Sequence, residues 1–116
     1  MKSGTMYEQG EIVLIPFPFT DLTTKKKRPV IVLSNKEYNE RIEDFIVCGI
    51  TSNIKDMLYS VLINSKDLVS GFLPKPSRIK VDKIFTLEQS LVIKKFAKVK
   101  SEIIRKVKQE LFKLFD

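Results

Sequence analysis

The sequence predicts a mainly β fold with helices (α+β), in which short strands build a small barrel or curled sheet and one amphipathic helix follows them. Apolar runs rich in β-branched residues recur along most of the chain, and turn residues separate them at intervals of about 8–12 residues. Helical periodicity appears only near the end of the chain, where apolar residues recur at three- and four-residue spacing. We therefore expect one domain spanning residues 1–116.

The predicted strands are apolar runs that end in turn or proline-containing segments. They cover Glu11–Phe17, Pro29–Ser34, Phe45–Ile50, Leu58–Ile63 and Ser77–Val81, with two further short strands expected within Lys83–Leu87 and Val92–Val99. Pro29–Ser34 is almost continuously apolar, as expected of a strand that is buried on both faces. Leu68–Phe72 is predicted to be short and irregular, and Thr20–Lys27 is predicted to be a polar loop.

The predicted helix occupies the last segment of the chain and makes about four turns. Lysines and arginines fill much of one side, and apolar residues form the other. The apolar positions are Ile103, Ile104, Val107, Leu111, Leu114 and Phe115. Ser101 is the expected N-cap of this helix.

The chain is strongly basic, with 21 Lys and Arg against 14 Asp and Glu, a net charge of +7. Such an excess favours association with polyanions such as RNA or DNA, although a merely lysine-rich, solvated surface is the alternative. No apolar stretch approaches the length of a membrane span, so we expect no membrane partner. The single cysteine, Cys48, lies in an apolar run, which predicts a buried thiol in a protein of the reducing cytoplasm.

The absence of histidine restricts the chemistry of the chain. It excludes ribonucleases that use paired imidazoles and hydrolases in which histidine activates a serine or cysteine. There is no glycine-rich phosphate loop, and the usual ligands of a zinc site are missing. We therefore expect no metal or cofactor, and any catalysis must depend on Arg, Lys, Thr, Ser, Asp or Glu.

Two polar segments are candidates for a functional site. Arg28 precedes Pro29 at a strand entrance and follows Lys25, Lys26 and Lys27. Its guanidinium presents a planar donor fork that suits phosphate oxygens, although a solvated loop charge is the alternative. The run Thr51–Asn53 follows a buried strand, where its side chains could bind a phosphate or cap a turn.

The order of these segments is similar to that of the MazF/PemK family of toxin endoribonucleases (mRNA interferases). The resemblance is carried by Gly10–Phe17, Lys27–Ser34, Cys48–Ser52 and Asp82–Leu87, in that order along the chain. It implies an SH3-like barrel that assembles as a homodimer. It further implies a toxin of a type II toxin–antitoxin system that is neutralised by a cognate antitoxin protein.

The resemblance also implies a reaction. Single-stranded mRNA is cleaved at specific short sequences, without a metal. A ribose 2′-hydroxyl attacks the adjacent phosphate and leaves a 2′,3′-cyclic phosphate and a free 5′-hydroxyl.

Residues of the family site map onto this chain position by position. Arg28 and Thr51 match the catalytic arginine and threonine. Lys80 and Asp82 stand where some members have an arginine and an aspartate that act as acid and base. Thr23 stands where some members carry an acidic residue, so Asp82, Asp21 and Glu11 remain as alternative bases. The expected RNA-binding residues are Thr20, Thr23, Lys25, Lys26, Lys27, Ser52, Asn53 and Ser77.

Three phenylalanines could stack on bases, namely Phe17, Phe19 and Phe72, but we expect each to lie in the core. Two other functions stay open at this point. The departures at Thr23 and Lys80 favour a non-catalytic basic barrel that binds nucleic acid or protein. A toxin of the same fold could instead act on a topoisomerase.

Overall fold

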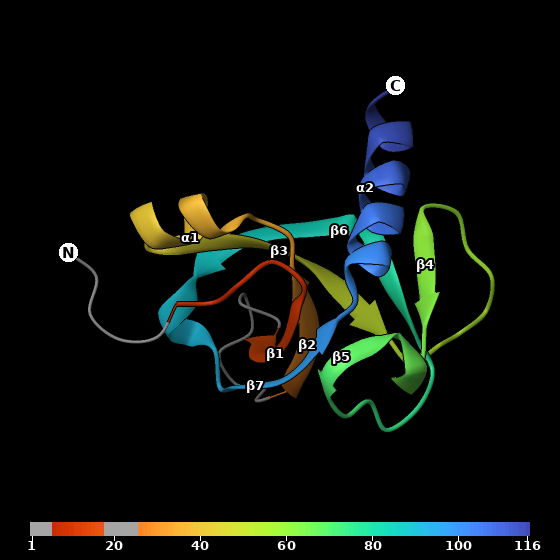
Figure 1. Cartoon of the computed structure of the whole chain (residues 1–116), viewed down its shortest axis with the longest axis horizontal. Helices are drawn as coiled ribbons and strands as arrows, with labels where there is room; N and C mark the ends of the chain where they lie inside the picture. The colour runs from red at the N-terminus through yellow and green to blue at the C-terminus, as the bar shows by residue number, and fades with distance from the viewer. Residues whose placement is uncertain (1–5, 18–25) are drawn as a thin grey trace.

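The computed structural model describes residues 6–17 and 26–116, and in these residues seven antiparallel strands form one sheet curled into a half-barrel (Figure 1). The strands are β1 (Glu11–Phe17), β2 (Lys26–Val32), β3 (Asp44–Thr51), β4 (Ser60–Ile63), β5 (Leu68–Gly71), β6 (Ser77–Glu88) and β7 (Lys94–Val99). The helices are α1 (Lys36–Arg41) and α2 (Ser101–Phe115), and single 3₁₀ turns span Ser65–Asp67 and Gln89–Leu91. The strand order is β4-β6-β3-β2-β1-β7-β5, which confirms the expected mainly β fold with a C-terminal helix.

The second strand begins earlier than expected. Pairing with β1 continues from Ile12↔Ile31 to Phe17↔Lys26, so Lys26 and Lys27 belong to β2 and not to a loop. The rest of the predicted loop, which contains Thr20, Thr23 and Lys25, lies outside the described residues. Burial on both faces of the strand is confirmed, because Val30, Ile31 and Val32 are all buried, with Ile31 in one core cluster and its two neighbours in the other.

The two strands expected at 77–81 and 83–87 form a single strand, β6, with a bulge in its middle. Cys48 of β3 pairs with Ile84, whereas the next residue, Gly49, pairs with Lys80. Residues 81–83 are therefore extra on the β6 side, which bends the strand and redirects its side chains. This bend explains the break in periodicity that suggested two strands.

Leu68–Gly71 is a four-residue edge strand whose pairing with β7 shifts register between Leu68 and Ser70, in agreement with the expected short and irregular segment. Gly71 adopts φ +85°, where a Cβ would overlap the carbonyl oxygen of Phe96. Only glycine fits this close approach of two backbones. Ser101 is the first residue of α2 and not its cap; Lys100 occupies the N-cap and makes no side-chain capping bond.

The core lies on both faces of the sheet. On one face, Ile103 and Val107 of α2 pack with residues of β3, β4 and β6. On the other, Phe45, Ile15 and Val30 belong to a second buried cluster. Cys48 is buried as expected, and burial together with the negative charge of Asp82 raises the pKa of its thiol to about 12. A thiol that stays protonated at neutral pH is chemically inert, so its role is to pack.

No helix of the described part of the chain is long and apolar enough to span a membrane.

Candidate active site

The sheet brings Arg28 and Thr51 to the same level on neighbouring strands. Val30 of β2 pairs with Gly49 of β3 in antiparallel register, and two residues further along both strands stand Arg28 and Thr51. Side chains two residues apart lie on the same face of a sheet, so both share the face of Val30 and Gly49. Two residues that are 23 positions apart in sequence thus face the same side.

The next strand, β6, adds two cations to this face. Thr51 pairs with Arg78, and Gly49 pairs with Lys80. Because β6, β3 and β2 are neighbours in the sheet (Figure 1), the side chains of Arg78 and Lys80 lie on the same face as Thr51 and Arg28. Of these cations, Arg28 and Lys80 line a common pocket and are donors that suit a phosphate group.

A pocket of about 210 Å³ opens beside Arg28. Arg28, Lys80 and Lys83 are its charged lining residues, whereas its apolar lining includes Phe17, Val30, Ile50 and Phe85. The rings of Phe17 and Phe85 meet edge to face, with centroids 5.6 Å apart and an angle of 61° between their planes. The pocket therefore combines aromatic walls with positive charge.

The hydroxyl of Thr51 is held by a local turn. Its Oγ1 accepts a hydrogen bond from the Asn53 backbone N–H at 3.1 Å, and Asn53 Oδ1 in turn accepts one from the Lys55 N–H at 3.1 Å. These bonds match the turn-capping alternative for this segment. They use only the acceptor capacity of Thr51, so its hydroxyl proton can still be donated to a ligand.

The remaining predicted residues differ in whether they line this pocket, lie exposed elsewhere or are buried. Lys80 lines it, whereas Asp82 is exposed on the β6 bulge and is not among its lining residues. Ser52 and Asn53 are exposed. Ser77 is buried, and its hydroxyl donates to the Lys75 carbonyl at 3.2 Å, so the structure does not bring it to the surface.

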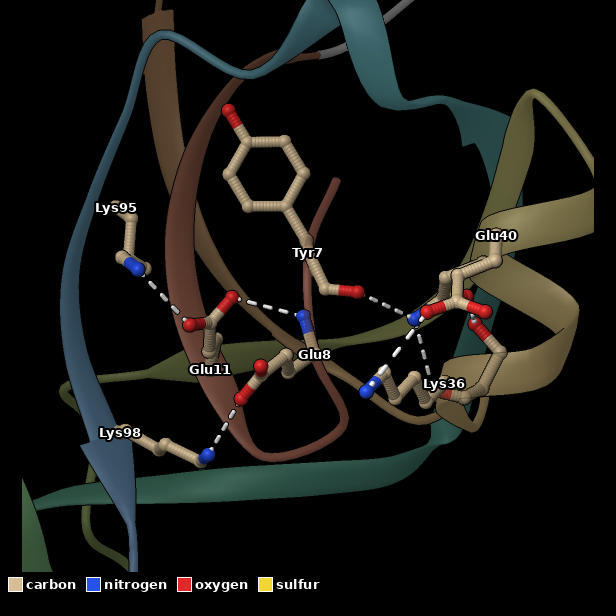
Figure 2. Close-up of polar contacts among 9 residues, drawn as sticks. Tyr7, Glu8, Glu11, Lys36, Glu40, Lys95 and Lys98 are labelled. Atoms are coloured by element: carbon tan, nitrogen blue, oxygen red, sulfur yellow. Dashed lines mark hydrogen bonds and ion pairs between the residues drawn. The ribbon is translucent and has the colours of Figure 1, made fainter. Parts of the chain in front are cut away.

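Glu11, one of the alternative bases, lies at the other end of β1 and is already paired. Its carboxylate accepts hydrogen bonds from Lys95 Nζ at 3.0 Å and from the Glu8 N–H at 2.8 Å, and both contacts are drawn as dashed lines in Figure 2. The hydrogen bond and the charge of Glu11 raise the pKa of Lys95. Ile15, the partner of Arg28, is four residues away, which is about 13 Å along a strand. The structure thus separates Glu11 from Arg28; Asp21, another alternative base, lies outside the described residues.

The three phenylalanines differ in position. Phe17 is half-buried in the pocket wall. Phe72 is 67% exposed, so the expectation that it lies in the core was wrong, because β5 is an edge strand and nothing described covers the residue that follows it. Phe19 lies outside the described residues.

Arg78 is a residue of this face that sequence reasoning missed. Its side chain is only 13% exposed, and it fastens the segment between Thr51 and β4. Its Nε donates to the Ile54 carbonyl at 3.1 Å, Nη1 to Ser60 Oγ at 3.2 Å, and Nη2 lies 3.5 Å from Asp56. These partners lie 18 to 24 residues from Arg78, so no local sequence pattern announces them.

Replacing Arg78 by alanine should loosen the segment 52–59, since three contacts that tie it to β6 are lost. We expect amide hydrogen exchange at residues 52–59 to accelerate by at least about tenfold, while α2 stays protected. Arg78→Lys retains the positive charge but not the several donors of the guanidinium, so amide hydrogen exchange of this segment should be intermediate between the wild type and the alanine variant. Unchanged exchange in the alanine variant would show that the segment is held by other contacts.

Among the described residues, no group of three or more His, Cys, Asp or Glu side chains is arranged to hold a metal ion.

Residues 8–115 match the family model of the PemK-like, MazF-like toxins of type II toxin–antitoxin systems. This chain belongs to the PemK/MazF toxin family. The match covers nearly the whole sequence and includes Arg28, Thr51, Lys80 and Asp82. No curated protein sequence matches the chain significantly.

Solved structures of similar fold include an endoribonuclease and two MazF proteins. An endoribonuclease in complex with its cognate antitoxin, from a mycobacterial species, is 17% identical, with 94% of each chain covered and a TM-score of 0.75. A MazE–MazF structure from Deinococcus radiodurans is 21% identical, with 97% of each chain covered and a TM-score of 0.73. The Mycobacterium tuberculosis toxin MazF-mt6 is 18% identical, covers 91% of this chain and 96% of its own, and has a TM-score of 0.73. These similarities confirm the barrel-like fold that the resemblance implied.

Proposed function

We propose that this PemK/MazF-family protein is a toxin endoribonuclease that cleaves single-stranded mRNA at specific short sequences in the cytoplasm. The observation that carries the proposal is the register that sets Arg28 and Thr51 on one face of neighbouring strands, beside Lys80. Neither a protein-binding surface nor a structural sheet requires the guanidinium of Arg28 and the hydroxyl of Thr51 to lie together on one face of the sheet. A single MazF/PemK-like domain, residues 1–116, would contain the whole site of one protomer.

The proposed reaction is an internal transfer at phosphorus. The ribose 2′-oxygen forms a bond to the adjacent phosphorus and the bond to the 5′-oxygen breaks, which gives a 2′,3′-cyclic phosphate and a free 5′-hydroxyl. The guanidinium of Arg28 and the hydroxyl of Thr51 donate hydrogen bonds to the phosphate oxygens as negative charge accumulates on them. These donors need no metal ion.

Proton transfer requires two further groups. We assign Lys80 to donate a proton to the leaving 5′-oxygen, since its ammonium lines the pocket that contains Arg28. We assign Asp82, which follows Lys80 by two residues on β6, to accept the proton of the 2′-hydroxyl. Asp82 takes up one proton and Lys80 releases one. The enzyme returns to its starting state when Asp82 loses its proton to water and Lys80 regains one from water.

The backbone of the RNA would extend away from this pocket in both directions along the surface. Lys26 and Lys27 are exposed at the start of β2, directly before Arg28, and suit contacts with phosphates. Ser52 and Asn53 lie exposed beyond Thr51. Thr20, Thr23 and Lys25 complete the proposed RNA-binding set.

The proposal is tested by incubating the purified protein with a long single-stranded RNA in EDTA and mapping the new 5′ ends. We expect discrete cuts at a recurring short sequence. RNA binding without any cut, across several unrelated RNAs, would favour the non-catalytic basic barrel instead.

We propose that the protein works as a homodimer. The C-terminal end of α2 extends beyond the sheet (Figure 1), and there Phe112 and Phe115 are 71% and 76% exposed. Large aromatic side chains in such a position are typical of an interface. A second proposed partner is a cognate antitoxin protein that covers the RNA site; the mycobacterial and Deinococcus toxins of similar fold have been solved with an antitoxin or with MazE.

Replacing Phe112 and Phe115 together by glutamate should convert the dimer into a monomer, because the interface would then bury two unpaired charges. Sedimentation velocity at micromolar concentration measures the change. Lys106→Glu and Lys113→Glu on the same helix also add two carboxylates, with a larger change in net charge, at other exposed positions and should leave the dimer intact. A dimer that survives the double phenylalanine substitution would place the interface elsewhere.

A further inference from the structure

The pocket beside Arg28 has more features than a phosphate site requires. A phosphate would need the cations Arg28, Lys80 and Lys83 only. The pocket also has an aromatic wall, in which Phe17 and Phe85 contact each other at 5.6 Å, and a buried apolar floor at Val30. Flat aromatic surfaces next to cations are typical of sites that hold an unstacked nucleobase.

The polar side chains of this pocket are all of one kind. Arg28, Lys80 and Lys83 donate hydrogen bonds and cannot accept them. A base edge with acceptors is therefore favoured: guanine presents O6 and N7, and uracil presents O4. Adenine and cytosine present an exocyclic amino group, which is itself a donor and would meet a donor.

We propose that this pocket holds the nucleobase next to the scissile phosphate and selects the keto bases, guanine and uracil, over the amino bases, adenine and cytosine. The proposal rests on the ribonuclease function above, because it takes the scissile phosphate to lie between Arg28 and Thr51. Lys83 is then a specificity-determining residue that takes no part in the bond-breaking step.

Gly49 offers a way to block the pocket without touching Arg28 or Thr51. It pairs with Val30 and Lys80 and shares their face, so a side chain added here projects toward the pocket that it lines. A Cβ at this position would meet Lys83 Cβ at 3.6 Å, which is an ordinary contact. Gly49→Val should therefore fill the pocket beside Arg28. It should not disrupt β3, because β-branched residues such as valine are favoured in strands.

The first arm of the test measures cleavage. An RNA pool with a randomised segment is digested and the bases on both sides of each cut are counted. We expect one flanking position to hold guanine or uracil about tenfold more often than adenine or cytosine. Lys83→Glu, which replaces a donor by an acceptor, should shift this position toward adenine and cytosine, and Gly49→Val should remove the bias. Lys108→Glu makes the same charge change as Lys83→Glu, but on α2 and outside the pocket, and should leave the preference for guanine or uracil unchanged.

The second arm measures binding without cleavage, using 2′-O-methyl oligo(U) and oligo(C), which lack the attacking hydroxyl and match in size. Fluorescence anisotropy should show oligo(U) binding at least about fivefold more tightly than oligo(C), with the order reversed in Lys83→Glu.

The two arms separate the failures. Cuts without a keto bias, or with a bias that survives both Lys83→Glu and Gly49→Val, overturn the base pocket and leave the ribonuclease function standing. A preference for oligo(U) that Lys83→Glu reverses, without any cleavage, supports the selection of keto bases by this pocket and overturns the ribonuclease function together with the placement of the base next to a scissile phosphate. Equal binding of the two oligonucleotides without cleavage overturns both.

Discussion

Replacing Arg28 by alanine should lower the rate of RNA cleavage by about 10²–10³-fold, the usual cost of removing one donor that stabilises charge in a transition state. Arg28 is exposed, and β2 holds its backbone through the pairing with Ile15. The substitution should therefore leave the fold intact, and the free energy of unfolding should change little. Single-turnover cleavage of an RNA that contains a mapped site measures the effect.

Two neighbouring variants make this result specific to the guanidinium. Arg28→Lys retains the charge but cannot form the two-pronged contact with phosphate oxygens, so most of the rate should still be lost. Lys27→Ala removes one positive charge at the adjacent exposed position and should weaken binding with little change in the single-turnover rate at saturating protein. Equal losses of rate in the Lys27 and Arg28 alanine variants would mean that RNA cleavage depends on the total positive charge of this surface and not on a catalytic arginine.

Replacing Gln89 by alanine should lower the free energy of unfolding by about 3 kcal/mol, the largest effect on stability that we expect from a polar residue. Gln89 is only 5% exposed. Its Nε2 donates to the carbonyl oxygens of Asn39, Ile42 and Asp44 at 2.9–3.3 Å, and its Oε1 accepts the Tyr7 N–H at 3.1 Å. The side chain thus joins the N-terminal segment, α1 and the start of β3.

The loss of Gln89 leaves several buried backbone groups without this partner, and each unsatisfied group costs about 1–3 kcal/mol. Urea unfolding of Gln89→Ala measures the change. Gln109→Ala makes the same substitution at an exposed position of α2 and should alter stability by no more than about 0.5 kcal/mol. Similar stabilities of the two variants would show that the buried network around Gln89 contributes nothing specific.

Sequence periodicity predicted the elements whose burial is set by local pattern. The apolar run around Val30–Val32 predicted a strand buried on both faces, and the spacing of Ile103 and Val107 predicted the face that α2 packs on the sheet. Periodicity could not reveal the bulge in β6, because the three extra residues, 81–83, are defined by pairing with β3. It also could not place Phe72, whose exposure depends on which strand ends up at the edge of the sheet.

The candidate site was predictable only in part, for a related reason. Short sequence segments that follow one another in the order typical of the family identified Arg28 and Thr51. That these two residues lie on one face depends on the register of β2 and β3, which the sequence does not reveal. Arg78 was missed since all its partners lie in a distant loop and on β4. The aromatic wall formed by Phe17 and Phe85 was likewise hidden, because it joins residues 68 positions apart.

We propose that a 2′-hydroxyl of the RNA, activated beside Arg28 and Thr51, is the nucleophile of the cleavage reaction. This proposal is tested by preparing an RNA that carries a single 2′-deoxy nucleotide immediately 5′ of a mapped cut, together with the unmodified RNA. We predict that the unmodified RNA is cut to a 2′,3′-cyclic phosphate and a 5′-hydroxyl, and that the substituted RNA is not cut at that position. Cleavage of the 2′-deoxy RNA at the same position would contradict the claim.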